Sequence, residues 1–98
     1  MIIRIVRMTF TDEGAKEFLP IFEKHKTLIR HFPGCSHLEL LKDIRQPNTY
    51  TTLSHWDKPE SLENYRTSEL FEQVWGKTKT HFAEKTQAFS FEKFIEVD

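Results

Sequence analysis

Aromatic and imidazole side chains are concentrated between His55 and Phe82, on and beside one helical segment. The group comprises two tryptophans, one tyrosine and two histidines: Trp56, Trp75, Tyr65, His55 and His81. Flat aromatic side chains that line a pocket are suited to binding a flat organic ligand, whereas the same side chains in a core only fill space. The residues alone leave both interpretations open.

Arg7 is the most informative charged residue, because it shares a face of the first predicted strand with Ile3 and Ile5. A guanidinium on an apolar face must find an anion, a carbonyl oxygen or water. In one interpretation, Arg7 orients a carboxylate, phenolate or enolate in a pocket on the helix side of the sheet. In the alternative, Arg7 lies at the end of the sheet and pairs with an acidic residue such as Glu39.

His25 is the second candidate for chemistry, because it falls on the apolar stripe of the first predicted helix, between Phe22 and Ile29. A neutral imidazole in that position could accept a proton from a substrate. The same residue could instead be a satisfied core or interface histidine, and the sequence does not say whether it faces a pocket or the core.

Metal and cofactor sites find no support in the sequence. His37, His55 and His81 have no ligand-type neighbour at metal-site spacing, and Cys35 is the only cysteine. With three glycines in the chain, no glycine-rich phosphate loop can be built, and no Ser-His-Asp series is present. We therefore predict neither a metal nor a cofactor, and an enzyme built on this chain would use cofactor-independent chemistry.

Composition predicts a single domain over residues 1–98 and limits the partners. Fourteen basic and 15 acidic residues give a net charge of -1 without a basic stripe, so we expect no nucleic-acid partner. Arg4 and Arg7 interrupt the apolar start, and nothing approaches a membrane span. The lone cysteine suits a reducing compartment, which predicts a cytoplasmic protein.

Hydrophobic periodicity predicts the order β-α-β-β-α-β, a ferredoxin-like α+β fold with a four-stranded antiparallel sheet. The expected strands are residues 1–10, 35–44, 49–56 and 86–97, and the expected helical regions are residues 11–32 and 60–82. A turn at "RQPN" joins the middle strands into a hairpin. A Thr11/Asp12 cap should start the first helix, and Pro20 should kink it or mark its true start. Ser68 should cap a second helical piece.

The first predicted strand has apolar side chains on both faces, which indicates a central strand that is covered twice. Both helices cover one face of the sheet, so a second copy of the same sheet is the economical cover for the other. This predicts a homodimer, with Val6 and Met8 in its interface.

The run "FPGCSHLELL", the tryptophan at position 56 and the run "ESLENYRTSELF" together resemble the antibiotic biosynthesis monooxygenase (ABM) family, which includes quinol monooxygenases and is related to haem-degrading monooxygenases. The likeness extends from the first strand to Phe94. It implies a dimeric α+β barrel with a pocket between each sheet and its own helices. It also implies that Tyr65 and Trp75 face this pocket with Phe71 in its wall, and often a cofactor-independent oxygenation of aromatic or quinol-like substrates.

Three positions depart from the pattern of the haem-degrading relatives. The haem-degrading relatives that this chain resembles have an asparagine at the position of Arg7, a tryptophan at that of Tyr65 and a histidine at that of Trp75. Many other family members carry a histidine where Tyr65 stands. Without the histidine at position 75 the expected axial iron ligand is missing, so haem degradation is not predicted.

The sequence therefore predicts a small cofactor-independent monooxygenase acting on an aromatic or quinol-like small molecule. His25 would be the base, Arg7 with Tyr65 would stabilise the oxyanion, and Tyr65, Phe71 and Trp75 would contact the substrate. Trp56 is expected to be structural. The alternative is a non-catalytic dimeric module that binds a small aromatic or apolar metabolite, and oxygen consumption would separate the two.

Overall fold

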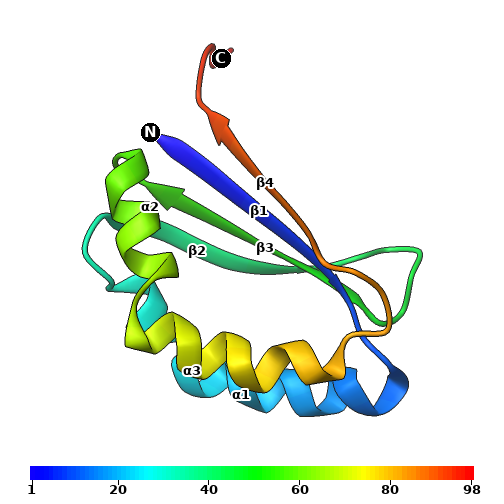
Figure 1. Ribbon diagram of the computed structural model, residues 1–98. Coiled ribbons are helices and arrows are strands. Elements are labelled where there is room, and N and C mark those ends of the chain that lie inside the picture. Colours follow the sequence, from blue (N-terminus) through cyan, green and yellow to red (C-terminus); the bar gives the residue numbers. More distant parts are fainter.

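The computed structural model describes residues 1–98 and contains one antiparallel sheet of four strands (Figure 1). The elements, in chain order, are β1 (Ile2–Thr9), α1 (Asp12–Arg30), β2 (Cys35–Lys42), β3 (Thr49–Trp56), α2 (Pro59–Arg66), α3 (Glu69–Thr78), the short 3-10 helix η1 (Lys79–His81) and β4 (Gln87–Glu92). The strand order is β2-β3-β1-β4, so β1 is an inner strand. This confirms the predicted ferredoxin-like α+β fold. None of the helices combines the length and the apolar character that a membrane-spanning segment requires.

Helix α1 begins where the sequence supplies a cap. Thr11 Oγ1 accepts a hydrogen bond from the backbone N–H of Gly14 at 2.9 Å, which satisfies one of the amides that a helix start leaves free. The helix does not start at Pro20 but continues through it. Pro20 lies on the exposed side, so the Lys16 carbonyl that loses its partner there can accept a hydrogen bond from water.

Ser68 divides the second helical region into α2 and α3, as its predicted capping role requires. Its hydroxyl accepts a hydrogen bond from the N–H of Phe71 at 3.1 Å and lies 2.6 Å from the carbonyl oxygen of Tyr65, to which it donates. One side chain therefore ends α2 and starts α3. The resulting bend brings the rings of Tyr65 and Phe71 edge to face at 5.2 Å.

The helices lie together on one face of the sheet (Figure 1). Val6 and Met8 point to this helix side: both line the space beneath the helices, and Met8 is part of the buried core with Phe10 and Phe18. The prediction that Val6 and Met8 face a second copy was therefore wrong. Apolar residues on both sides of β1 indicate that both sides are covered, but they do not indicate which side the helices cover.

The opposite face of the sheet carries apolar side chains and no helix. Ile5 lies between Leu53 of β3 and Phe89 of β4, and Ile3 lies opposite Phe91. Residues directly opposite one another in an antiparallel pair share a face, so these side chains form one patch, here called the open face. The side chains of Phe89 and Phe91 are 48% and 51% exposed. A sheet face in contact with water only would normally be polar.

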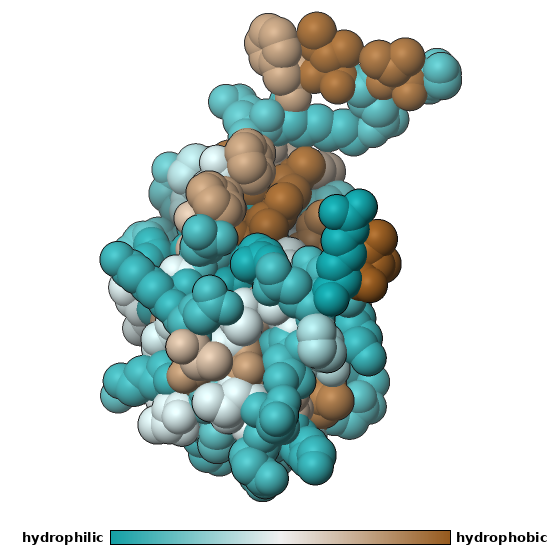
Figure 2. All heavy atoms as spheres, turned by 90° about the vertical axis from the view of Figure 1, so that its right-hand side faces the viewer, coloured by the Kyte–Doolittle hydropathy of each residue, from teal (hydrophilic) through white to brown (hydrophobic).

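Strand β4 ends at Glu92, five residues before the predicted end at position 97. Glu92 pairs with Ile2, the first residue of β1, so no partner strand exists beyond this point. The apolar residues of the following segment, Phe94, Ile95 and Val97, are 91%, 74% and 85% exposed. Figure 2 shows this segment projecting from the domain, with hydrophobic side chains gathered on it and next to its base.

Candidate functional site

The helix-side face of the sheet and the three α-helices enclose a cavity of about 340 Å³. This volume falls within the range of small-molecule sites. Every strand and every α-helix contributes to its lining, so the cavity exists only in the folded chain. The apolar and aromatic lining residues are Val6, Met8, Phe18, Phe22, Ile29, Leu38, Trp56, Leu62, Tyr65, Phe71, Val74, Trp75 and Ala88.

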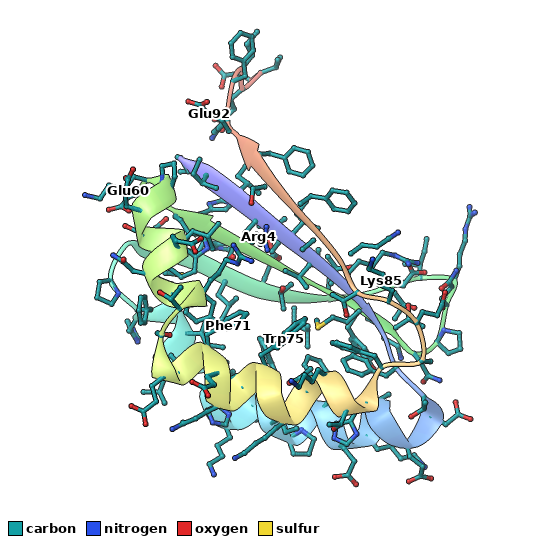
Figure 3. The ribbon with its side chains drawn as sticks, in the orientation of Figure 1. Arg4, Glu60, Phe71, Trp75, Lys85 and Glu92 are labelled. Atoms are coloured by element: carbon teal, nitrogen blue, oxygen red, sulfur yellow. The ribbon has the colours of Figure 1, made fainter.

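A continuous row of rings forms the helix-side wall of the cavity. Phe71 and Trp75, one turn apart on α3, stack with centroids 5.8 Å apart and planes 11° apart. Tyr65 meets Phe71 edge to face and stacks on Trp56 at 5.1 Å. In Figure 3, Phe71 and Trp75 rise from α3 toward the sheet. The structure thus brings Tyr65, Phe71 and Trp75 together in one cavity, where the resemblance had placed them.

Trp56 lines the cavity and is also a central part of the fold. Its side chain is only 1% exposed and packs with Cys35 and Leu62 in a second core cluster. Its indole N–H donates to Ser54 Oγ at 2.9 Å, which satisfies the buried donor. The expected structural role of Trp56 agrees with this burial.

Tyr65 is the only lining residue with a phenolic hydroxyl. Burial raises the pKa of this hydroxyl well above its ordinary value, and the nearby Cys35 thiol raises it further. The hydroxyl therefore stays protonated at neutral pH and can donate a hydrogen bond to a ligand. It cannot serve as a base there.

Two arginines bring positive charge to the cavity: Arg4 of β1 and Arg66 at the end of α2. Arg4 Nη1 donates to Ser90 Oγ at 2.9 Å, and Arg66 Nη1 lies 3.2 Å from Glu63 Oε2. Figure 3 shows Arg4 on the sheet, across the interior from the α3 rings.

Burial lowers the pKa of the Arg4 guanidinium, and the charge of Arg66 lowers it further, while Glu63 opposes this effect. The guanidinium remains charged at neutral pH, because the pKa of arginine starts above 12. The charged form of Arg4 is therefore less favourable in this partly buried position than in water. An anionic group of a ligand would stabilise this charge.

Arg7, the predicted anion-binding residue, lies outside the cavity. Its position on β1 places it on the opposite face from Arg4, and its Nη2 lies 3.3 Å from Gln46 Oε1 and 3.8 Å from Asp43 Oδ2. Both partners belong to the β2–β3 turn. The expectation of a helix-side Arg7 was wrong, whereas pairing with an acid near the sheet end is confirmed, with Asp43 in place of Glu39.

His25 is buried, with 5% of its surface exposed, but it is not a lining residue of the cavity. Its Nδ1 lies 2.8 Å from the carbonyl oxygen of Ile21, one turn earlier in α1, and must donate to it. The imidazole N–H therefore finds its hydrogen-bond acceptor within α1. Since it does not line the cavity, its predicted contact with a substrate is not supported by its position.

The lining contains no histidine, cysteine, aspartate or glutamate. No group of three or more such residues in the structure could hold a metal ion. Of the residue types that usually bind haem iron in a pocket, only Tyr65 and Met8 are present. Haem binds tyrosine as the phenolate, and the raised pKa of Tyr65 opposes that form.

Sequence reasoning missed Arg4, Arg66 and Thr86 as lining residues. The alternation of β1 separates Arg4 from Arg7, but selecting Arg4 required knowing which face the helices cover. Arg66 is the last residue of α2, which lies in a predicted helical region. No local sequence signal indicates that the Arg66 side chain reaches the cavity. Thr86 precedes β4 in an irregular segment and has no sequence signal.

Comparisons with known proteins agree with this fold. The sequence profile of the family described as antibiotic biosynthesis monooxygenase matches residues 1–75. No curated protein sequence matches significantly. A crystal structure of an antibiotic biosynthesis monooxygenase has a TM-score of 0.89 at 17% identity, covering 97% of this chain and 100% of the other.

Two further solved structures share the fold. A Deinococcus radiodurans protein assigned to the same class has a TM-score of 0.90 at 16% identity, covering 100% of this chain and 97% of the other. A conserved protein from Methanosarcina mazei Go1 has a TM-score of 0.88 at 19% identity, covering 96% and 94%. At these identities the structures show the common fold, and the profile match shows the family. The chain belongs to the antibiotic biosynthesis monooxygenase family.

Proposed function

We propose that this protein is a cofactor-independent monooxygenase that oxidises a phenol or quinol bearing an acidic oxygen. The family supports a monooxygenase. The observation that carries the proposal is the partly buried Arg4 guanidinium beside a cavity walled by aromatic rings. Such a cavity binds a flat ring by stacking and favours its anionic form by charge.

The chemistry begins with the phenolate, because removing the phenolic proton makes the ring electron-rich enough to react with oxygen. Arg4, with Arg66 beside it, lowers the pKa of the bound phenol by stabilising the negative charge. One oxygen atom of O₂ becomes the new carbonyl oxygen of a quinone, and the other leaves as water with the two hydrogens lost by the phenol. The substrate supplies all of the electrons, so the balance requires no separate reductant.

The proton has to leave without a side-chain base in the cavity, since the lining includes no histidine or carboxylate. We assign its removal to water, with the substrate bound directly as the anion. Tyr65 donates a hydrogen bond to an oxygen of the ligand, and Phe71 and Trp75 stack on the ring. The aromatic walls exclude water from the anion that reacts.

The working form that we propose is a homodimer in which two open faces pack against each other. Ile3, Ile5 and Leu53, together with the half-exposed Phe89 and Phe91, form an apolar patch on a face that no helix covers. A second copy would bury this patch on both chains at once. The cavity lies on the other side of each sheet and keeps its own entrance.

The same lining supports the second candidate, a non-catalytic module that binds a small aromatic or apolar metabolite. A cavity without a proton acceptor can bind a phenolate without promoting its formation. The two candidates differ in turnover and share their binding residues.

Oxygen uptake with hydroxynaphthoates and naphthols tests the proposal. We expect protein-dependent uptake with one quinone formed per O₂ consumed. The Arg4→Met variant should lose about tenfold or more of kcat/KM, while Arg7→Met, the matched arginine on the opposite face, should retain it. Saturable binding without any oxygen uptake would reject the monooxygenase and leave the binding module.

A further inference from the structure

Thr86 Oγ1 is the only buried side-chain oxygen or nitrogen in the structure without a hydrogen-bond partner. Buried polar atoms are nearly always paired, because an unpaired one loses its hydration without compensation. Thr86 is also one of the residues that line the cavity. An unpaired hydroxyl beside a cavity is a place where a ligand atom can supply the missing bond.

The position of Thr86 along the sheet relates it to Arg4. Ala88 and Ser90 lie on one side of β4, Thr86 comes one residue before this strand begins, and the Arg4 guanidinium is bonded to Ser90 Oγ. Four residues of extended chain separate Thr86 from Ser90, or about 13 Å. The hydroxyl and the guanidinium therefore mark two ends of the cavity.

The cavity between these two ends is apolar. Ala88 lies opposite Val6 in the β1–β4 pairing, and both residues line the cavity. Trp75 and Phe71 contribute rings from the helix side. The ligand surface that fits is polar at one end, flat and apolar in the middle, and polar at the other end.

We infer that Thr86 is a specificity-determining residue that hydrogen-bonds a polar group at the end of the ligand far from Arg4. This inference rests on the proposed function, since it describes the substrate of the same cavity. Subtracting a hydrogen bond at each end from the strand distance leaves roughly 7 Å between the two polar groups of the ligand. This is longer than the spacing of the two oxygens of a para-benzenediol and is close to that of two oxygens at the 2 and 6 positions of a naphthalene.

Three matched probes test the inference by calorimetric binding, which requires no turnover. 6-Hydroxy-2-naphthoate carries an anion and a distant hydroxyl, 2-naphthoate lacks the hydroxyl, and 4-hydroxybenzoate is one ring shorter. We expect 6-hydroxy-2-naphthoate to bind the wild-type protein about tenfold more tightly than 2-naphthoate, the scale of one hydrogen bond. 4-Hydroxybenzoate should bind more weakly than either, because it has one ring less to bury against the apolar lining.

The Thr86→Val variant should remove the preference for 6-hydroxy-2-naphthoate and leave 2-naphthoate binding unchanged, because valine keeps the shape and lacks the hydroxyl. Thr86→Ser should retain the preference. Thr51→Val is the matched control, since Thr51 pairs with Arg7 and does not line the cavity. The ligand-free Tm of Thr86→Val should equal or exceed that of the wild type, which verifies folding.

Equal affinity of the two naphthoates for the wild type, or a preference that survives Thr86→Val, overturns the inference. Absence of any naphthoate binding overturns it together with the proposed function. If Thr86 discriminates as expected but no oxygen is consumed, only the catalytic proposal fails.

Discussion

Arg4 and Arg7 lie three residues apart on β1, and their side chains leave the strand on opposite faces of the sheet. Arg4 meets the cavity and bonds Ser90, whereas Arg7 meets the β2–β3 turn. Two arginines on the same strand therefore have different surroundings, one at the cavity and one at the turn. This pair provides a direct test of where the ligand binds.

Replacing Arg4 with methionine should weaken the binding of an aromatic anion by about 1.5–3 kcal/mol, the scale of a charge-assisted hydrogen bond. Arg7→Met should leave the affinity unchanged. Isothermal titration of both variants with 2-naphthoate checks this. Equal losses in the two variants would contradict the assignment of the anion site to Arg4.

Replacing Trp56 with alanine should lower the free energy of unfolding by about 3–5 kcal/mol, because it opens a large cavity in a packed region. Trp75 is at a partly exposed position on α3, so Trp75→Ala should lower the free energy of unfolding less than Trp56→Ala does. It should weaken ligand binding more than Trp56→Ala does. Urea unfolding combined with ligand titration separates the two effects. A smaller loss of stability for Trp56→Ala than for Trp75→Ala would refute the structural role of Trp56.

Replacing Ile5 with aspartate should disrupt the proposed dimer, because it puts a charge between Leu53 and Phe89 on the open face. Leu28→Asp is the control, since Leu28 is 59% exposed on α1. Light scattering should show a dimer for the wild type and for Leu28→Asp, and a monomer or poor expression for Ile5→Asp. A wild-type monomer at micromolar concentration would rule out the proposed assembly.

The raised pKa of Tyr65 predicts a loss of stability at high pH. An ordinary tyrosine in the unfolded chain ionises near pH 10, whereas the partly buried Tyr65 keeps its proton to higher pH. Stability is therefore unaffected below about pH 10 and falls above it, because the unfolded state then binds fewer protons than the folded state.

For one such group the slope approaches about 1.4 kcal/mol per pH unit between its unfolded and folded pKa values. Urea midpoints from pH 9 to 11 should decline less steeply in Tyr65→Phe than in the wild type. Identical pH profiles for the two proteins would show that Tyr65 is not shielded from water.

Haemin should give no stoichiometric, saturable Soret shift when it is titrated into the protein. The lining offers no histidine or cysteine to bind the iron, and the raised pKa of Tyr65 disfavours its phenolate form. A known haem-binding protein serves as the positive control. A tight shift followed by opening of the ring with a reductant would overturn this expectation.

Local sequence signals determined most of the secondary structure. Thr11 and Ser68 cap α1 and α3, and "RQPN" joins β2 to β3, as their side chains and backbone preferences predict. These features are local because a cap or a turn is satisfied by atoms within a few residues. The order of the elements then predicted the fold, since few topologies accept β-α-β-β-α-β.

Only the tertiary structure decided which face of β1 meets the helices. A strand with Ile3 and Ile5 on one side and Val6 and Met8 on the other has no local feature that distinguishes the two. The choice depends on how α1 and α3 return over the sheet, and it places Arg4 at the cavity instead of the predicted Arg7. The end of β4 at Glu92 was decided in the same way, because a strand ends where its partner ends and not where its apolar residues do.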